Sequence, residues 1–280
     1  MTVTNSNQFD KEHAAGERFG FGDNWRDFLS NLNDERIDVA VQSLQSMLEI
    51  DTLAGKSFLD IGSGSGLFSL AARKLGAKVT SFDYDPNSVW CTAELRRRYF
   101  RTDSNWTVER GSVLDLDYLQ KLGQFDIVYS WGVLHHTGKM WQALDNVDLC
   151  VLKSGKLFIS LYNDQGWPSI GWAWLKRTYC HSPKLMQTTI AALSAIRLWG
   201  PKTIKDFLKF KPFETWRTYQ KQRGMSPWHD VIDWVGGYPF EVSKPEQIFD
   251  FYKNKGYNLN KLKTCGGKFG CNEFVFTKHL

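Results

Sequence analysis

The sequence predicts an α/β fold, in which a mostly parallel sheet carries helices on both faces. From Lys56 onward, short apolar strand-like segments alternate with segments whose apolar residues recur at helical spacing. A glycine-rich turn joins the first of these strands to the helix that follows it. Two further strand signals near the end of the chain are separated by a short glycine loop, which predicts an antiparallel hairpin.

Each expected element has a local signal. A helix is expected to begin at Asn33, because this capping residue and two acidic residues precede apolar positions at helical spacing up to Leu48. Gly76 is expected to end a helix at residues 67–75, and Thr137 to cap a helix at residues 139–151. The other helices are expected at residues 87–99, 118–122 and 245–255. The strands are expected at residues 57–61, 78–82, 106–109, 125–129, 156–161, 258–264 and 273–278.

The alternation stops between about Gln165 and Tyr238, where seven of the twelve tryptophans are found. Between Trp172 and Arg223, eleven lysines and arginines stand against two acidic residues, although the whole chain has a net charge of only +5. An insertion after the fifth strand of such a sheet emerges at the carboxyl edge, where ligands bind. We therefore expect a mostly helical lid over a substrate.

The chain of 280 residues, 42% of them hydrophobic, is long enough for one large domain with an elaboration. Four parts are expected along it. They are an N-terminal helical cap at residues 1–50, a core at 51–163, the Trp-rich basic lid at 164–243, and a helix and hairpin at 244–280 that complete the core.

The turn at residues 58–68 (FLDIGSGSGLF) is the most informative part of the chain. Its glycines are spaced G-x-G-x-G, so the third comes one residue too early for a dinucleotide fingerprint. Asp60 at the end of the strand would repel a pyrophosphate but suits a ligand that carries an ammonium group. S-adenosylmethionine (SAM) is such a ligand. The alternative is a plain strand-to-helix turn in which Asp60 is solvated.

A second carboxylate stands at the end of the second expected strand. Asp83 follows Asp60 by 23 residues, and a carboxylate at this strand tip can accept hydrogen bonds from both hydroxyls of a ribose. A solvated strand-end acid is the alternative. Asp85 is expected instead to cap the next helix.

The chain resembles the class I SAM-dependent methyltransferases, and in particular their branch of small-molecule enzymes like those of ubiquinone biosynthesis. The resemblance rests on residues 59–66 (LDIGSGSG), 81–83 (SFD), 125–128 (FDIV) and 133–136 (VLHH), and it covers about residues 55–161. It implies a Rossmann-like seven-stranded sheet with an antiparallel last strand and a helical insertion after strand 5. It also implies SAM as cofactor and S-adenosylhomocysteine as product.

The resemblance assigns cofactor contacts to matching positions of this chain. An aromatic and glycine-rich segment around Trp25 is expected to fold back over the cofactor. Many relatives have an acidic residue beside the adenine, where this chain has Gly111, Ser112 and Val113. The expected cofactor contacts are Trp25, Asp60, Gly62, Ser63, Gly64, Gly66, Asp83, Tyr84, Ser112, Val113, Ser130 and Trp131.

A hydroxyl acceptor needs a general base, and histidine is the usual one near neutral pH. His135 and His136 follow the fourth expected strand, although one of such a pair is often structural. A second cluster, at residues 223–239, brings His229 beside Asp230 in a glycine-rich loop. That loop could equally be an ordered surface turn. The residues expected to contact the substrate are Tyr162, Asn163, Arg223, Trp228, Asp233 and Tyr238.

No metal site is expected. The five cysteines form no C-x-x-C pair, and Cys265 and Cys271 bracket what we interpret as a glycine turn between strands. The N-terminus lacks a signal-peptide pattern, and no apolar run reaches the length that spans a membrane, so a cytoplasmic protein is expected.

The function expected is SAM-dependent transfer of a methyl group to a small molecule, at a hydroxyl or carboxyl oxygen. The basic insertion would suit an anionic acceptor. One alternative is a methyltransferase acting on RNA, which the basic segment with its interleaved Trp and Tyr residues would support. Another is a methyltransferase acting on a lipid-linked acceptor at a membrane surface. A binding protein that retains only the fold is a further alternative, against which the intact Asp60, glycines and Asp83 argue. The sequence leaves the oligomeric state open.

Overall fold

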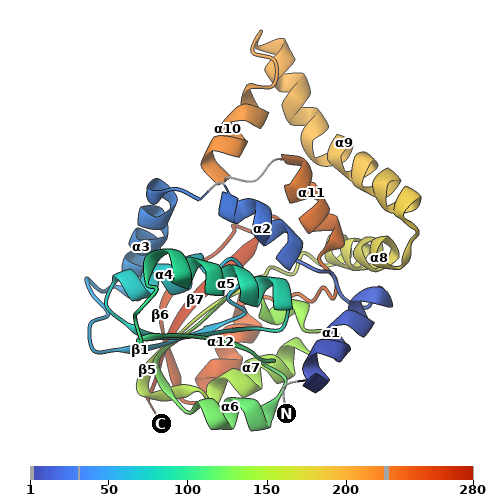
Figure 1. Ribbon diagram of the computed structural model, residues 1–280. Helices are drawn as coiled ribbons and strands as arrows, with labels where there is room; N and C mark the ends of the chain where they lie inside the picture. Colours follow the sequence, from blue (N-terminus) through green and yellow to red (C-terminus); the bar gives the residue numbers. More distant parts are fainter. Residues whose placement is uncertain (1–2, 31, 224–226, 280) are drawn as a thin grey trace.

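The computed structural model describes residues 3–30, 32–223 and 227–279, and its seven strands form one sheet in the order β3-β2-β1-β4-β5-β7-β6 (Figure 1). Strands β1 to β5 run parallel to one another, whereas β7 is antiparallel to both β5 and β6. The fold class predicted from the sequence is therefore confirmed. The strand bounds are β1 Ser57–Ile61, β2 Lys78–Asp83, β3 Trp106–Arg110, β4 Phe125–Trp131, β5 Val151–Tyr162, β6 Tyr257–Lys263 and β7 Cys271–Lys278.

Both faces of the central strands β1 and β4 are buried, which explains why their residues are mostly apolar. Adjacent residues of β1 show this directly. Phe58 belongs to a core cluster with α3 (Asp34–Leu48), α4 (Leu67–Lys74) and α5 (Pro86–Tyr99). Leu59 belongs to the opposite cluster with α6 (Leu116–Leu122), α7 (Met140–Asp148) and α12 (Pro245–Asn254). The period of two along the strand therefore builds two cores.

Two predicted helix caps are confirmed, and one is wrong. The side chain of Asn33 accepts the backbone N–H of Arg36 at 3.0 Å, and Asp85 caps α5 through the N–H of Asn87 at 2.8 Å. Thr137 does not cap α7. Its hydroxyl donates to the carbonyl of Leu134 at 2.8 Å and closes a 3-10 turn, so the helix begins only at Met140, with Lys139 as its N-cap.

The insertion is helical, as expected. It comprises α8 (Trp167–His181), α9 (Lys184–Leu208), α10 (Glu214–Arg223) and α11 (Pro227–Gly236). Helices α8, α9 and α11 share a small apolar core of their own, to which Trp172, Trp199 and Val235 contribute. Figure 1 shows α9 running away from the sheet to an apex, from which the chain returns through α10.

The N-terminal segment is tied to the core at several points. It forms α1 (Val3–Ala14) and α2 (Gly22–Ser30). The backbone N–H of Gly22 donates to the buried carboxylate of Asp85 at 2.8 Å, and the N–H of Phe19 donates to the carbonyl of Tyr238 at 2.9 Å. These bonds fix the segment between the tip of β2 and the end of the lid.

Among the described residues, no helix is both long enough and apolar enough to cross a membrane.

Two variants should distinguish the loss of a helix cap alone from the loss of a cap that also holds the N-terminal segment through Gly22. We expect Asn33→Ala to lower the free energy of unfolding by about 1 kcal/mol, the usual cost of losing a cap. Asp85→Ala should cost about 2 kcal/mol or more, because it also leaves the buried N–H of Gly22 without its acceptor. Urea unfolding of both variants measures the difference, and equal losses would contradict the tether.

Candidate functional site

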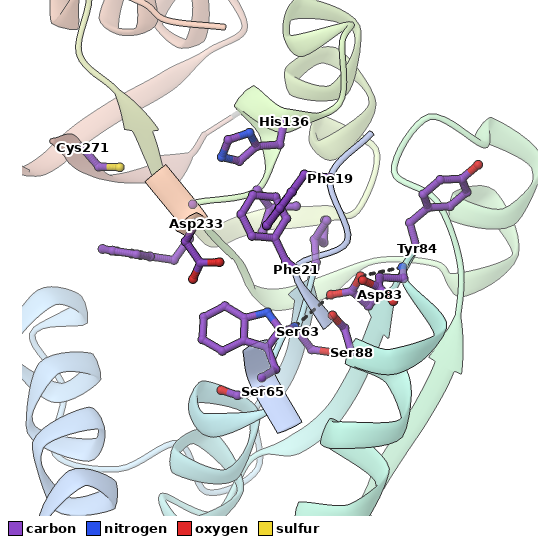
Figure 2. Close-up of a pocket in the computed structure, with 18 of the residues that line it drawn as sticks. Phe19, Phe21, Ser63, Ser65, Asp83, Tyr84, Ser88, His136, Asp233 and Cys271 are labelled. Carbon is purple, nitrogen blue, oxygen red and sulfur yellow. Dashed lines mark hydrogen bonds between the residues drawn. The ribbon is translucent and has the colours of Figure 1, made fainter. Parts of the chain in front are cut away.

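A cavity of about 890 Å³ lies at the carboxyl edge of the sheet. Its floor is formed by the ends of β1, β2 and β4, and the N-terminal segment and the lid helices α9 and α11 complete its wall. Figure 2 shows Ser63 and Asp83 on one side of this space and His136 and Asp233 on the other. One cavity therefore joins the two groups of residues that the sequence singled out.

The glycine turn after β1 needs its glycines. Gly62 and Gly64 have φ angles of 76° and 53°, in the left-handed region that favours glycine. A Cβ at Gly62 would lie 2.4 Å from the side chain of Val133, and one at Gly64 would lie 3.1 Å from the indole nitrogen of Trp25. Trp25 therefore closes over the turn, as expected for the N-terminal segment. Gly66 does not line the cavity and instead approaches Thr92 of α5.

Asp60 is buried at the end of β1 and lines the cavity. The hydroxyl of Ser69 donates to its carboxylate, and Ser69 is itself bonded to Ser81 of the neighbouring strand. Burial raises the pKa of Asp60 to about 7. Asp60 is thus a held, desolvated carboxyl group and not a solvated turn residue.

Asp83 lies at the tip of β2 and receives two backbone hydrogen bonds. The N–H of Gly64 donates to one carboxylate oxygen at 2.9 Å and the N–H of Asp85 to the other at 2.9 Å. Burial raises the pKa of Asp83 to about 6, against the opposing effect of these two bonds. Within the described residues, no lysine or arginine forms an ion pair with Asp60 or Asp83. The two carboxylates are therefore available to a cationic or hydroxyl-bearing ligand.

The wall after β3 is the place expected for the adenine. Ser112 and Val113 both line the cavity, as does Tyr84 on the β2 side. The hydroxyl of Ser112 accepts the backbone N–H of Leu114 at 3.2 Å, so it is engaged in its own turn. Gly111 is required there, because a Cβ would lie 2.2 Å from the ring of Tyr118.

Ser130 and Trp131, at the end of β4, have different environments. Trp131 lines the cavity, whereas Ser130 is fully buried and donates to the carbonyl of Ile61 at 3.0 Å. Tyr129, which the sequence analysis did not single out, also lines the cavity. Its buried hydroxyl has no hydrogen-bond partner among the described residues. A bound ligand could satisfy this group.

The two histidines after β4 are not equivalent. His135 is fully buried outside the cavity lining, and its Nδ1 accepts the backbone N–H of Tyr162 at 3.3 Å. His136 lines the cavity, and its Nδ1 lies 2.6 Å from the carbonyl oxygen of Pro239. A carbonyl can only accept, so the neutral ring carries its proton on Nδ1 and has Nε2 as its acceptor. Burial, with Lys176 nearby, lowers the pKa of His136 to about 3 and keeps the ring neutral.

Asp233 of α11 faces the same space as His136 (Figure 2). The side-chain amide of Asn24, in the N-terminal segment, donates to its carboxylate. Burial raises the pKa of Asp233 to about 7, and the charge of Asp230 acts in the same direction. Asp233 is therefore the carboxyl group on this side of the cavity whose protonation changes near neutral pH.

Lys176 lies behind this wall and was not identified from the sequence as a site residue. Its ammonium group is fully buried, donates to the backbone carbonyl of Trp234 and lies 4.4 Å from the centroid of that ring. Burial lowers its pKa to about 7. Asn24 and Lys176 belong to segments far from α11 in the sequence, and no local pattern reveals contacts of this kind.

The remaining residues that were predicted to be catalytic (His229 and Asp230) or to contact the substrate divide into three groups. Tyr162, Asp230 and Tyr238 line the cavity. Asn163 is held by Asn272 at 3.0 Å outside the lining, and Trp228 is partly exposed and also outside it. Arg223 and His229 fall outside the residues whose side chains the structure describes.

The charge of the insertion lies mostly away from the cavity. Of its eleven basic residues, Lys202 is the one that lines the cavity, within the part of the insertion that the structure describes. Asp230 and Asp233 also line the cavity. The basic character of the segment therefore belongs chiefly to its outer surface.

The described residues contain no group of three or more His, Cys, Asp or Glu that could hold a metal ion.

A family model for a methyltransferase domain matches residues 59–157, the stretch from β1 to β5 that builds the floor of the cavity. The chain is 31% identical over 156 residues to the ubiquinone biosynthesis O-methyltransferase of Xanthomonas oryzae pv. oryzae, which is 56% of this chain and 61% of that protein. The match thus spans less than two thirds of the curated relative.

Solved structures share the fold. A SAM-dependent methyltransferase from Anabaena variabilis aligns with a TM-score of 0.51 at 11% identity, over 92% of this chain and 93% of that one. The structure of PKMT2 from Rickettsia typhi in complex with AdoHcy aligns with a TM-score of 0.55 at 15% identity, over 85% of this chain and 52% of that one.

The matched stretch is a class I SAM-dependent methyltransferase domain, whose cofactor is SAM. The cavity fits that cofactor, because its unpaired carboxylates at β1 and β2 suit an ammonium group and a ribose, and the hydroxyl of Tyr129 lacks a partner among the described residues. The individual cofactor contacts named from the sequence stay predictions.

The role of Asp83 can be tested directly. We expect Asp83→Ala to weaken SAM binding at least about a hundredfold, because two hydrogen bonds to a charged acceptor are worth about 1.5–3 kcal/mol each. Isothermal titration calorimetry measures the affinity.

Asp126→Ala is the matched control, since Asp126 lies at the opposite end of the sheet, bonded to Ser57 and Lys56. It should keep wild-type affinity. Unchanged affinity in Asp83→Ala would remove this residue from the site.

Proposed function

We propose that this chain transfers the methyl group of SAM to a hydroxyl oxygen of a small acceptor. The observation that carries the proposal is the single cavity that runs from the glycine turn and Asp83 to His136 and Asp233. Its volume of about 890 Å³ lies near the upper end of the range for ligand pockets, about 300–1,000 Å³. That volume accommodates a cofactor and a small acceptor side by side.

The protein's task in this reaction is alignment and removal of a proton. SAM supplies an already activated methyl group. Holding an acceptor in line with that group can lower the barrier by about 7–11 kcal/mol. The aromatic wall of Phe21, Tyr162 and Trp234 would hold the acceptor and exclude water.

A hydroxyl acceptor fits the charges of the cavity better than a carboxylate does. Asp230 and Asp233 line the wall where the acceptor would lie, and two carboxylates there repel a third. Methylation of a hydroxyl group needs a general base. The pKa of Asp233, about 7, suits that role better than the pKa of His136, about 3. We assign the proton of the hydroxyl group to Asp233. Because that hydroxyl has a single proton to donate, we assign Nε2 of His136, which is itself an acceptor, to a second donor group of the acceptor molecule.

Incorporation of labelled methyl groups tests the function. The purified protein is incubated with methyl-labelled SAM and, separately, with water-soluble metabolites, total RNA and a lipid extract. We expect label in a small hydroxyl compound and none with Asp83→Ala. Label in RNA would replace the proposal with the nucleic-acid alternative. Binding of SAM without transfer to any fraction would leave a binding protein.

The pH profile of the reaction tests the base. At saturating SAM we expect kcat to rise with pH through about 7, because Asp233 must lose its proton before it can accept another. Asp233→Asn should lower kcat by roughly a hundredfold, within the range for loss of a general base, and remove this rise. Asp230→Asn, one helical turn away, should keep it. If the rise persists in Asp233→Asn, another group is the base.

A further inference from the structure

The outer face of α9 carries large apolar side chains that the protein leaves in solvent. Leu193, Ile196 and Ile204 each expose more than 60% of their surface. The same helix packs Ala191, Ser194 and Trp199 inward, against the core that α9 shares with α8 and α11. Folding of the lid thus uses one face of α9 and leaves the other uncovered.

The exposed residues form a continuous stripe along the helix. Successive exposed residues are three, four or eight positions apart, so at 3.6 residues per turn they lie on the same side of the helix. Where the spacing is eight, a small residue, Thr189 or Gly200, lies on that side between them. We call this set the outer stripe. Its members are Leu185, Thr189, Leu193, Ile196, Gly200, Ile204, Phe207 and Leu208.

The stripe ends at the apex of the molecule, where the chain turns from α9 into α10 (Figure 1). Phe210 exposes 94% of its surface there, and Leu208 exposes 76%. Phe210 has a φ angle of 57°, so the backbone at the apex holds a left-handed conformation that is unfavourable for a bulky residue. The turn therefore presents its apolar side chains outward.

Positive charge surrounds this apolar surface. Residues 184–213 contain six lysines and arginines and a single acidic residue, Asp206. The carboxylate of Asp206 is bonded to Thr215 at 2.6 Å. Lys205 and Lys209 are exposed beside the apex, and among the described residues neither forms an ion pair. The apex thus combines apolar side chains with lysines that form no ion pair among the described residues.

We propose that the outer stripe and the apex dock on a bilayer that contains anionic lipids. Apolar side chains enter the boundary between headgroups and acyl chains, and lysines at the same level attract anionic headgroups. Phe207, Leu208 and Phe210 would insert, while Lys205 and Lys209 would lie among the headgroups. The positive charge of this surface thus complements the negative charge of the lipid headgroups.

Other occupants match this surface less well. A second copy of the chain would set the same cations against each other across a two-fold interface, which costs free energy. A nucleic acid would attract the lysines and could stack on Phe207 and Phe210, but most of the outer stripe consists of Leu and Ile side chains, which offer a base no planar ring.

Docking here would place the cavity close to the membrane. Leu198, Trp199 and Lys202 of α9 line the cavity from the side opposite the outer stripe. An acceptor that resides in a membrane would then reach the cavity past this helix. That consequence rests on the proposed function, whereas the docking itself does not.

Flotation with lipid vesicles tests the docking in the absence of SAM, so its outcome is independent of methyl transfer. The probes are vesicles of phosphatidylcholine alone and of phosphatidylcholine with phosphatidylglycerol. We expect binding to the anionic vesicles, weakening with salt, and little binding to the neutral ones. Failure of the wild-type chain to float with anionic vesicles at low salt overturns the proposal.

Paired variants locate the surface. Lys205→Gln with Lys209→Gln should weaken binding about 25-fold, since each lysine near an anionic surface contributes roughly fivefold. Phe210→Ser should weaken it about tenfold or more, the effect of withholding one large apolar side chain from the bilayer. Lys74→Gln with Lys153→Gln, exposed on the core, and Leu262→Ser on β6 are the matched controls. They should bind like the wild type.

Two further outcomes count against the proposal. If the apex variants float like the wild type, the surface lies elsewhere. If the wild type forms a dimer in sedimentation equilibrium that Phe210→Ser abolishes, the stripe is an interface between copies. All changed side chains are exposed, and matched thermal melting curves confirm that the variants fold.

Discussion

The structure is organised around two carboxylates that the fold removes from water without giving them a counter-ion. Asp60 and Asp83 end neighbouring parallel strands, so the sheet brings them to the same edge. Burial raises both pKa values, and hydrogen bonds from Ser69, Gly64 and Asp85 partly offset this cost. Such an arrangement loses folding stability unless a ligand recovers it, because desolvated charges are expensive. The left-handed backbone of the glycine turn leaves that edge of the sheet accessible to a ligand.

Closure of the site depends on segments that are remote in sequence. The N-terminal segment reaches Asp85 through Gly22 and Asp233 through Asn24, which is 209 positions away along the chain. It therefore bridges the cofactor side and the lid side of the cavity. Because the same segment places Trp25 against Gly64, its position couples the glycine turn to the carboxylate that we assign as the base.

The sequence was sufficient wherever the determinants are local. Alternating apolar segments, the glycine turn and the capping residues Asn33 and Asp85 predicted the sheet, its hairpin and the floor of the cavity. The prediction for Thr137 failed because its hydroxyl bonds to Leu134 within a 3-10 turn, a choice between two local partners. The sequence could not show which of His135 and His136 faces the cavity, because the direction of each side chain depends on the exact conformation of the turn. The cavity wall around His136 and Asp233 depends on Asn24, Lys176 and Pro239, which are far apart in the sequence and meet only in the folded chain.

The insertion can be understood from the two faces of α9. Its basic residues suggested an anionic acceptor, but the structure turns most of them outward, and the cavity itself is richer in carboxylates than in cations. Charges that do not face the substrate are available to a surface outside the molecule. The inner face closes the cavity through Leu198 and Trp199, while the outer face presents Ile196 and the apex. One helix therefore carries both the outer stripe and part of the cavity wall, so whatever binds the stripe acts on the element that covers the cavity.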